Sequence, residues 1–173
     1  MHDKTTGSEN ISCCACCRAP LVEGVKVANA IGHVQHIRDG KVVWEETIHN
    51  VKTTAGIDFM FAQCYGTSAQ ANGLNYIALS NDTLTETTAS TVLSNEITTN
   101  NMGRAIGAYA HTPGQSTATI SKTFTCQTGA QSAQKAALFS ASSSGTMNHA
   151  LAFTQRALQV NDQLAVTFTL TLS

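Results

Sequence analysis

The segment QLAVTFTLTLS, at the C-terminal end of the chain, has the most regular pattern in the sequence. Apolar side chains stand there at every second position, and a period of two places one set of side chains on each face of a β-strand. The apolar set is Leu164, Val166, Phe168, Leu170 and Leu172. We therefore expect a strand with one face in a core and a threonine-covered opposite face, and we expect it to be paired inside a sheet.

Shorter runs of the same kind follow one another from Asn72 onward, separated by Gly, Asn, Ser and Pro. They are LNYIALS, RAIGAYAH, TATISKTFTC, AALFSAS and HALAFTQ. In these runs we expect the following residues to share apolar faces: Ile77 with Leu79; Ile106 with Ala108 and Ala110; Ala118 with Ile120, Phe124 and Cys126. Turns are expected at 113–116 and 142–145. The pattern predicts a mainly β fold, an antiparallel β sandwich or jelly-roll-like barrel.

The stretch HVQHIRDGKVVWEETI predicts a β-hairpin, because Asp39-Gly40 stands between two runs of strand-forming residues. Its second run mixes apolar and polar side chains on one face, which is typical of a half-buried or edge strand. Glu45 and Glu46 are adjacent, so on a strand they face apart and make a poor pair for acid–base catalysis. We expect Trp44 to anchor a core or an interface.

One or two short helices are expected. The first lies within NVKTTAGIDFMFAQCYG, where Val51, Ala55 and Phe59 recur at helical spacing and Gly66 is a suitable stop. Gly56 weakens this expectation, because a glycine inside a helix costs about 1 kcal/mol relative to alanine. The second is a short helix around 92–97, in a threonine-rich segment.

Composition limits the partners of the chain. Charged residues make up 12% of the sequence, against about 25% in typical domains. Ten basic and eleven acidic residues give a net charge of −1, and no Lys/Arg stripe could follow a phosphate backbone, so we expect no nucleic-acid partner. No apolar run has the roughly 20 residues that span a bilayer, and the polar N-terminus does not resemble a secretory signal. We expect a soluble chain made in a cytosol, with an extended arm at 1–23 and a β-sandwich domain at 24–173.

Four of the six cysteines, Cys13, Cys14, Cys16 and Cys17, occupy five consecutive positions in the arm. Two interleaved C-x-x-C pairs could bind zinc with His33 and His36, but zinc-binding histidines are usually about three to five residues apart, and on a strand these two would face opposite sides. A redox C-x-x-C usually opens a helix after a buried strand, and nothing strongly apolar precedes Cys13. Neighbouring cysteines do not easily bond each other. We therefore expect inter-subunit disulfides.

A cytosol keeps thiols reduced, but a particle assembled in a cell and then released could close such bridges, each worth about 2 to 4 kcal/mol. Cys64 is a candidate for a further disulfide, and Cys126 is expected to be a small buried core residue. His49, His111 and His149 have no nearby Ser/Asp spacing typical of a triad, and no phosphate-binding or dinucleotide motif occurs. The sequence predicts no catalytic residue, no resident metal and no cofactor.

The stretch DGKVVWEETIHNVKTTAG resembles a segment of virion proteins of tailed bacteriophages, in which a hairpin with D-G at its turn and W-E-E on its second strand leads into H-N and V-x-T-x-A-G. The runs YIALSND, SKTFT, AALFSA, LAFT and VTFTLTLS resemble the same group. The resemblance covers residues 32–173 and leaves out the cysteine arm. It implies a virion structural protein of the capsid decoration, neck or tail-fibre type, and it implies no catalytic residue.

We therefore expect a bacteriophage virion structural protein that stabilises the particle and is not an enzyme. Its partners would be copies of itself and other virion proteins of the capsid, portal, neck or tail, and a homo-oligomer such as a trimer is expected. It would be made in the host cytoplasm without a signal peptide. Two alternatives stay open: a host-receptor or glycan-binding tail module that uses loops 81–88 and 113–117, and a zinc-binding structural protein.

Overall fold

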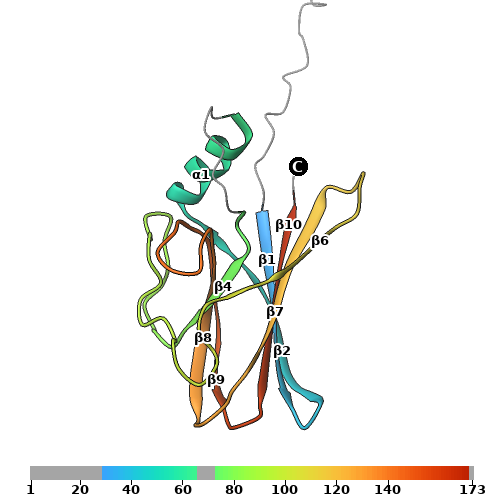
Figure 1. Ribbon diagram of the computed structural model, residues 1–173, viewed down its shortest axis with the longest axis vertical. Coiled ribbons are helices and arrows are strands. Elements are labelled where there is room, and N and C mark those ends of the chain that lie inside the picture. The colour runs from blue at the N-terminus through green and yellow to red at the C-terminus, as the bar shows by residue number, and fades with distance from the viewer. Residues whose placement is uncertain (1–28, 66–72, 172–173) are drawn as a thin grey trace, which may run out of the picture.

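The computed structural model describes residues 29–65 and 73–171, which form two five-stranded antiparallel sheets packed face to face (Figure 1). The first sheet has the order β2 (Lys41–His49), β1 (Asn29–Arg38), β10 (Gln163–Thr171), β7 (Thr117–Thr125), β6 (Ala108–His111). The second has the order β3 (Val51–Lys52), β9 (Met147–Leu158), β8 (Gln131–Phe139), β4 (Tyr76–Ser80), β5 (Ala105–Ile106). The mainly β sandwich expected from the sequence is thus confirmed.

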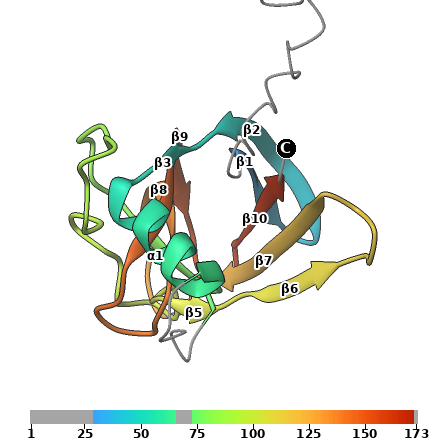
Figure 2. The same cartoon turned by 90° about the horizontal axis from the view of Figure 1, so that it is seen from above.

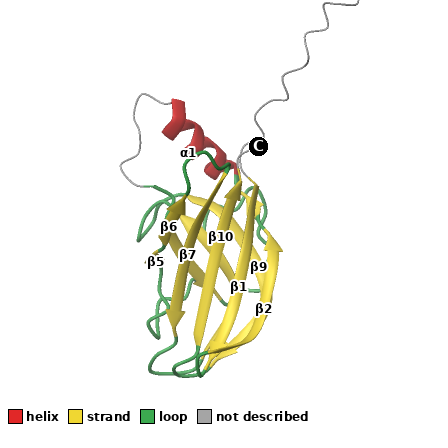
Figure 3. Cartoon of the chain, turned by 90° about the vertical axis from the view of Figure 1, so that its right-hand side faces the viewer, coloured by secondary structure: helices red, strands yellow, loops and turns green. Residues whose placement is uncertain are grey.

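The main core lies between the two sheets, which Figure 2 shows from above. Strand β10 is central in the first sheet, with β1 on one side and β7 on the other (Figure 3). Leu164, Val166 and Phe168 are completely buried, as their alternation predicts. From the facing sheet, Ile77 and Leu79 of β4 are equally buried. The sequence pattern therefore identified the inward face of both strands correctly.

The two open edges of the sandwich are both crossed by a chain segment that passes from one sheet to the other. Only Asn50 separates β2 from β3, and only Gly107 separates β5 from β6. At the first corner, the Asn50 side-chain oxygen accepts a hydrogen bond from the Ala30 backbone N–H (3.0 Å). At the second, the Gly107 N–H donates to the Asn75 carbonyl (2.7 Å). Such corners are a known way for strands to switch sheets in a sandwich.

The corner at Gly107 overturns one sequence expectation. Ile106, Ala108 and Ala110 do not share a buried face, since all three are exposed and belong to strands of different sheets. Instead, Ala105 packs against the main core. A Cβ atom at Gly107 would lie 2.7 Å from Ile120 Cγ2, so the absence of a side chain is what lets the corner approach β7 closely.

The long segment between β4 and β5 covers the outer face of the second sheet. There Leu93 is buried with Ala78 of β4 and with Ala137 and Phe139 of β8, which makes a second, smaller core. This explains the nearly continuous apolar run in β8, because its sheet is buried on both faces. The short helix expected around 92–97 is wrong: residues 94–95 form a turn and Glu96 makes an isolated bridge to Ser80.

Helix α1 (Thr54–Tyr65) follows β3 and lies over one end of the sandwich (Figures 1 and 2). It begins later than the sequence suggested, since Val51 and Lys52 pair with β9 as β3. Thr53 caps the helix, because its hydroxyl oxygen accepts a hydrogen bond from the Gly56 N–H (3.0 Å). Gly56 is required by packing: a Cβ atom there would be 2.6 Å from the Asn148 Cα. In the described part of the chain, no helix is long and apolar enough to cross a membrane.

Candidate functional site

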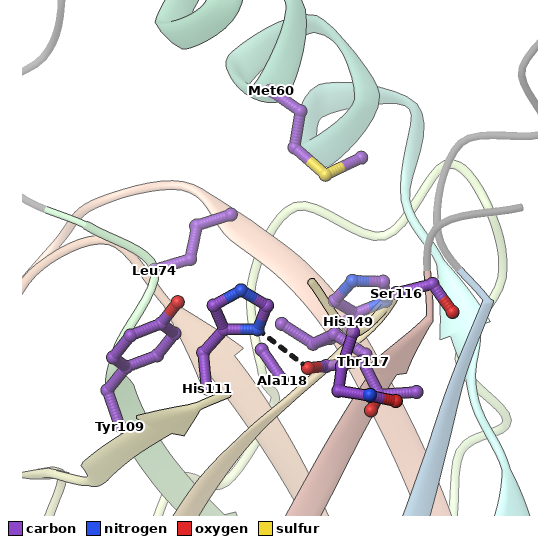
Figure 4. Close-up of a pocket in the computed structure, with 10 residues that line it drawn as sticks. Met60, Leu74, Tyr109, His111, Ser116, Thr117, Ala118 and His149 are labelled. Atoms are coloured by element: carbon purple, nitrogen blue, oxygen red, sulfur yellow. Dashed lines mark hydrogen bonds between the residues drawn. The ribbon is translucent and has the colours of Figure 1, made fainter. Parts of the chain in front are cut away.

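A cavity of about 300 Å³ lies at the end of the sandwich that carries α1 (Figure 4). Both sheets, the helix and the β6–β7 turn contribute to its wall. The apolar part consists of Met60 from α1, Leu74, Ala118 and Leu170, and the polar part consists of Tyr109, His111, Gln115, Ser116, Thr117 and His149. The cavity thus forms only when strands from distant parts of the sequence come together.

His111 and His149 enter this cavity with different hydrogen bonds. His111 Nδ1 lies 2.8 Å from the Thr117 carbonyl oxygen, which can only accept, so Nδ1 carries the proton. Its Nε2 is then an acceptor, and Figure 4 shows it directed toward the space below Met60. His149 Nδ1 receives a short hydrogen bond from the Asn50 side-chain amide. Its proton is therefore on Nε2 when the ring is neutral.

The surroundings of His149 favour the neutral ring. The residue is only 1% exposed. Burial, and to a smaller extent the positive charge of Lys52, lower the pKa of His149 to about 4. Both effects have the same sign, because each disfavours an imidazolium at this position. At neutral pH the wall of the cavity therefore contributes no charge from this residue.

The chemistry of the cavity suits binding of a small apolar or aromatic group. Met60, Leu74 and Leu170 supply apolar surface, and His111 Nε2 can accept one hydrogen bond from the bound group. Within the described residues, no three His, Cys, Asp or Glu side chains are placed so that they could hold a metal ion.

A cluster of ionic contacts ties the opposite end of the sandwich together. The Asp162 carboxylate lies in the β9–β10 turn and accepts hydrogen bonds from Arg38 Nε (2.9 Å) and Nη2 (2.6 Å) and from His36 Nε2 (2.8 Å). The Arg38 guanidinium in particular holds the pKa of Asp162 well below its usual range, with smaller contributions from the Gln159 N–H and from His36. These contacts join β1 to the turn and face no cavity described above.

The residues that the sequence singled out are dispersed. Cys13, Cys14, Cys16 and Cys17 lie outside the described residues, as does the proposed arm at 1–23, and the Cys64 side chain is not described either. His33 and His36 do face opposite sides: the His33 side chain is 41% exposed, whereas that of His36 is 2% exposed and bound to Asp162. These two histidines therefore do not form a common pair of zinc ligands.

Other sequence expectations are confirmed. Cys126 is completely buried, its thiol donates to the Gly129 carbonyl (3.0 Å), and burial raises its pKa. Glu45 and Glu46 face apart, since Glu45 binds Gln35 and Glu46 accepts a hydrogen bond from the Thr154 N–H. Trp44 is half-buried and packs on Phe153, with the ring centroids 6.1 Å apart.

The sequence did not predict the cavity or its two histidines. His111 and His149 are far apart in the sequence and no local motif surrounds either of them. Loop 113–117 contributes to the cavity, and no residue of loop 81–88 does. Lys135 was also not identified from the sequence. The only feature of the sequence that could have indicated it is that a single charged residue lies inside the apolar run AQKAALF.

Comparison of the chain with protein-family models, with curated proteins and with solved structures gave no match.

Proposed function

We propose that this chain is a structural subunit of a bacteriophage virion, a capsid decoration, neck or tail component that stabilises the particle. The observation that carries the proposal is that buried charged side chains connect separate segments of the fold. Asp162 joins β1 to a turn, as described above, and Arg104 joins three segments of the second sheet's outer side. Charges used in this way hold separate segments of a scaffold together.

The contacts of Arg104 illustrate this use. Its guanidinium forms two hydrogen bonds with the Glu96 carboxylate (2.9 and 2.5 Å) and donates to the carbonyl oxygens of Ala141 and Ser144. It also stacks over the Phe139 ring, with Cζ 3.6 Å from the centroid. One side chain thereby fixes the covering segment, the β8–β9 turn and β8, which is useful in a durable particle.

Exposed apolar residues on outer strands support contacts with neighbouring subunits. Val42 and Val43 on β2 are 50% and 52% exposed, and Ile106 and Tyr109 at the second corner are 56% and 63% exposed. Apolar surface of this kind on a sheet edge is a common contact between chains. In the proposed role it would pack against copies of this chain or other virion proteins.

The four cysteines of the arm would add covalent links. Strand β1, which begins at Asn29, starts at the end of the sandwich that carries α1 (Figure 1). Disulfides among Cys13, Cys14, Cys16 and Cys17 of neighbouring subunits would form once the particle leaves a reducing cytosol.

The test uses purified phage particles that encode this chain. Mass spectrometry should find the chain as a stoichiometric component, and non-reducing gels should show covalent multimers that become monomers with reductant. A particle whose chain carries Ser at the four arm positions should give monomers without reductant. Cys126→Ser is the matched control and should keep the multimers, because that thiol is buried.

Two results would contradict these statements separately. Absence of the chain from purified particles would refute the virion role. Presence in the particle as a monomer with and without reductant would refute the inter-subunit disulfides.

A further inference from the structure

Lys135 is a buried lysine that lies against two carboxyl groups. Its side chain is 2% exposed and points from β8 to the outer face of the second sheet, beneath the covering segment between β4 and β5. Its amine Nζ lies 2.9 Å from Glu86 Oε1 and 3.4 Å from Asp82 Oδ2. The side chains of Asp82 and Glu86 are themselves only 8% and 9% exposed. All three groups are thus largely removed from water.

The charges of this trio do not balance. One ammonium and two carboxylates leave one negative charge in excess, and an uncompensated buried charge is costly. The site brings an amine group into contact with two carboxyl groups, which are the groups needed to condense an amine with an acid.

The backbone holds Asp82 and Lys135 in place. Ser80, the last residue of β4, is the direct partner of Lys135 on β8. The Ser80 hydroxyl oxygen accepts a hydrogen bond from the Asp82 N–H (2.9 Å), and Asp82 Oδ1 accepts one from the Leu84 N–H (3.3 Å). Next to them, the Gln134 side chain donates to the Asn81 carbonyl (2.7 Å). Groups fixed in contact in this way react as if at high effective concentration.

The three side chains occupy different positions for such a reaction. Glu86 lies at hydrogen-bond distance from the amine, which suits proton transfer. Asp82 Oδ2 is farther from the amine, at 3.4 Å, so the carboxyl group of Asp82 is the second one in contact with Nζ. Asp82 Oδ1 is already bound by a backbone N–H, which would stabilise negative charge that develops on this oxygen when the carbon is attacked.

We propose that Lys135 Nζ and Asp82 Cγ become joined by an isopeptide bond after the chain has folded, with Glu86 as the proton carrier. Glu86 takes a proton from the Lys135 ammonium, and the neutral amine attacks Cγ of protonated Asp82, forming the C–N bond. The intermediate passes a proton from nitrogen to oxygen, one hydroxyl group receives a proton from Glu86, and its C–O bond breaks as water leaves.

The reaction balances without an oxidant or a second reactant. An ammonium, a protonated carboxyl and a carboxylate become an amide, a water molecule and a protonated carboxyl, since Glu86 recovers a proton as the carbonyl re-forms. The bond would anchor the covering segment to β8 and so fasten the second core. It does not depend on the virion role proposed above, nor on any cysteine.

The test is the intact mass of the folded, full-length chain, purified with reductant so that disulfides are absent. The mass should be lower than the sequence requires by one water molecule. Proteolysis and fragmentation should yield a branched peptide that joins Asp82 to Lys135, with no cleavage by trypsin after residue 135. The Glu86→Gln chain should have the full mass of its sequence, because no water is lost. The Lys41→Arg chain, altered at an exposed lysine, should be lighter than its sequence by one water molecule, as the unaltered chain is.

The proposal is overturned if the unaltered chain has the full mass that its sequence requires while its circular dichroism spectrum shows that it is natively folded. This test does not depend on whether the Glu86→Gln chain folds. A branched peptide that joins Lys135 to Glu86 instead would overturn the assigned roles.

Discussion

At the scale of single residues, His149 makes a specific contribution to the pH dependence of stability. Its pKa is lowered to about 4 in the folded chain, first by burial and then by Lys52, whereas histidine in an unfolded chain has a pKa of about 6.5. Between these values the unfolded state binds the proton and the folded state does not. The free energy of unfolding should therefore fall as the pH is lowered from about 6.5 to about 4, by up to about 3 kcal/mol. Urea unfolding over this pH range measures it.

The variants that check this prediction differ in burial. His149→Gln lowers stability at every pH, but its free energy of unfolding should depend much less on pH between about 6.5 and 4. His33→Gln removes a side chain that is 41% exposed and should keep the full dependence. Arg38 holds the pKa of Asp162 well below its usual range in the folded chain, so Asp162 adds a loss of stability of its own only toward the acid end of this range, where its carboxyl in the unfolded chain begins to bind a proton. An unchanged slope in His149→Gln would contradict the assignment.

At the scale of elements, local sequence patterns were sufficient to predict the strands with a regular alternation of apolar residues and the strands joined by a short turn. The alternation in β10 identified its buried face. Asp39 and Gly40 predicted the β1–β2 turn, and both have the positive φ that this turn needs (49° and 72°). The same period of two predicted that His33 and His36 face apart.

The elements that the sequence did not predict depend on contacts between distant segments. RAIGAYAH has the pattern of one continuous strand, and only the positions of β4 and β7 divide it at Gly107. The cavity needs His111 and His149 to meet, and the amine of Lys135 reaches a carboxyl group 53 positions earlier in the sequence. No periodicity within a short window carries information of this kind, so the candidate site was the least predictable part.

The corner at Gly107 gives a prediction at this scale. Its φ is not in the left-handed region, so an alanine would be acceptable to the backbone, but its Cβ would lie 2.7 Å from Ile120 Cγ2 and 3.2 Å from the Ser121 carbonyl oxygen. Gly107→Ala should therefore lower the free energy of unfolding by about 2 kcal/mol through overpacking alone. Urea unfolding measures this change.

Gly73→Ala is the matched control, because nothing lies within 4 Å of a Cβ at that exposed position. It should change stability by less than about 0.5 kcal/mol. Equal effects of the two substitutions would show that β7 and the corner are not in close contact.

At the scale of the whole molecule, the two sheets share one core and are joined by both corners, so they should unfold together. Trp44 reports on this directly, since it is the one tryptophan of the chain and belongs to β2 of the first sheet. It packs on Phe153 of β9 in the second sheet, and the Arg156 guanidinium lies over its ring, with Cζ 4.6 Å from the centroid. Its fluorescence therefore changes when the sheets separate at that edge.

We expect urea unfolding followed by Trp44 fluorescence to coincide with unfolding followed by far-ultraviolet circular dichroism, as in a two-state transition. Phe153→Leu removes the ring that Trp44 contacts and should shift both midpoints to lower urea by the same amount, because the contact belongs to the common core. A fluorescence transition that precedes the loss of strand signal would instead mean that the edge formed by β2 and β9 opens on its own, so that the sandwich does not unfold as one unit.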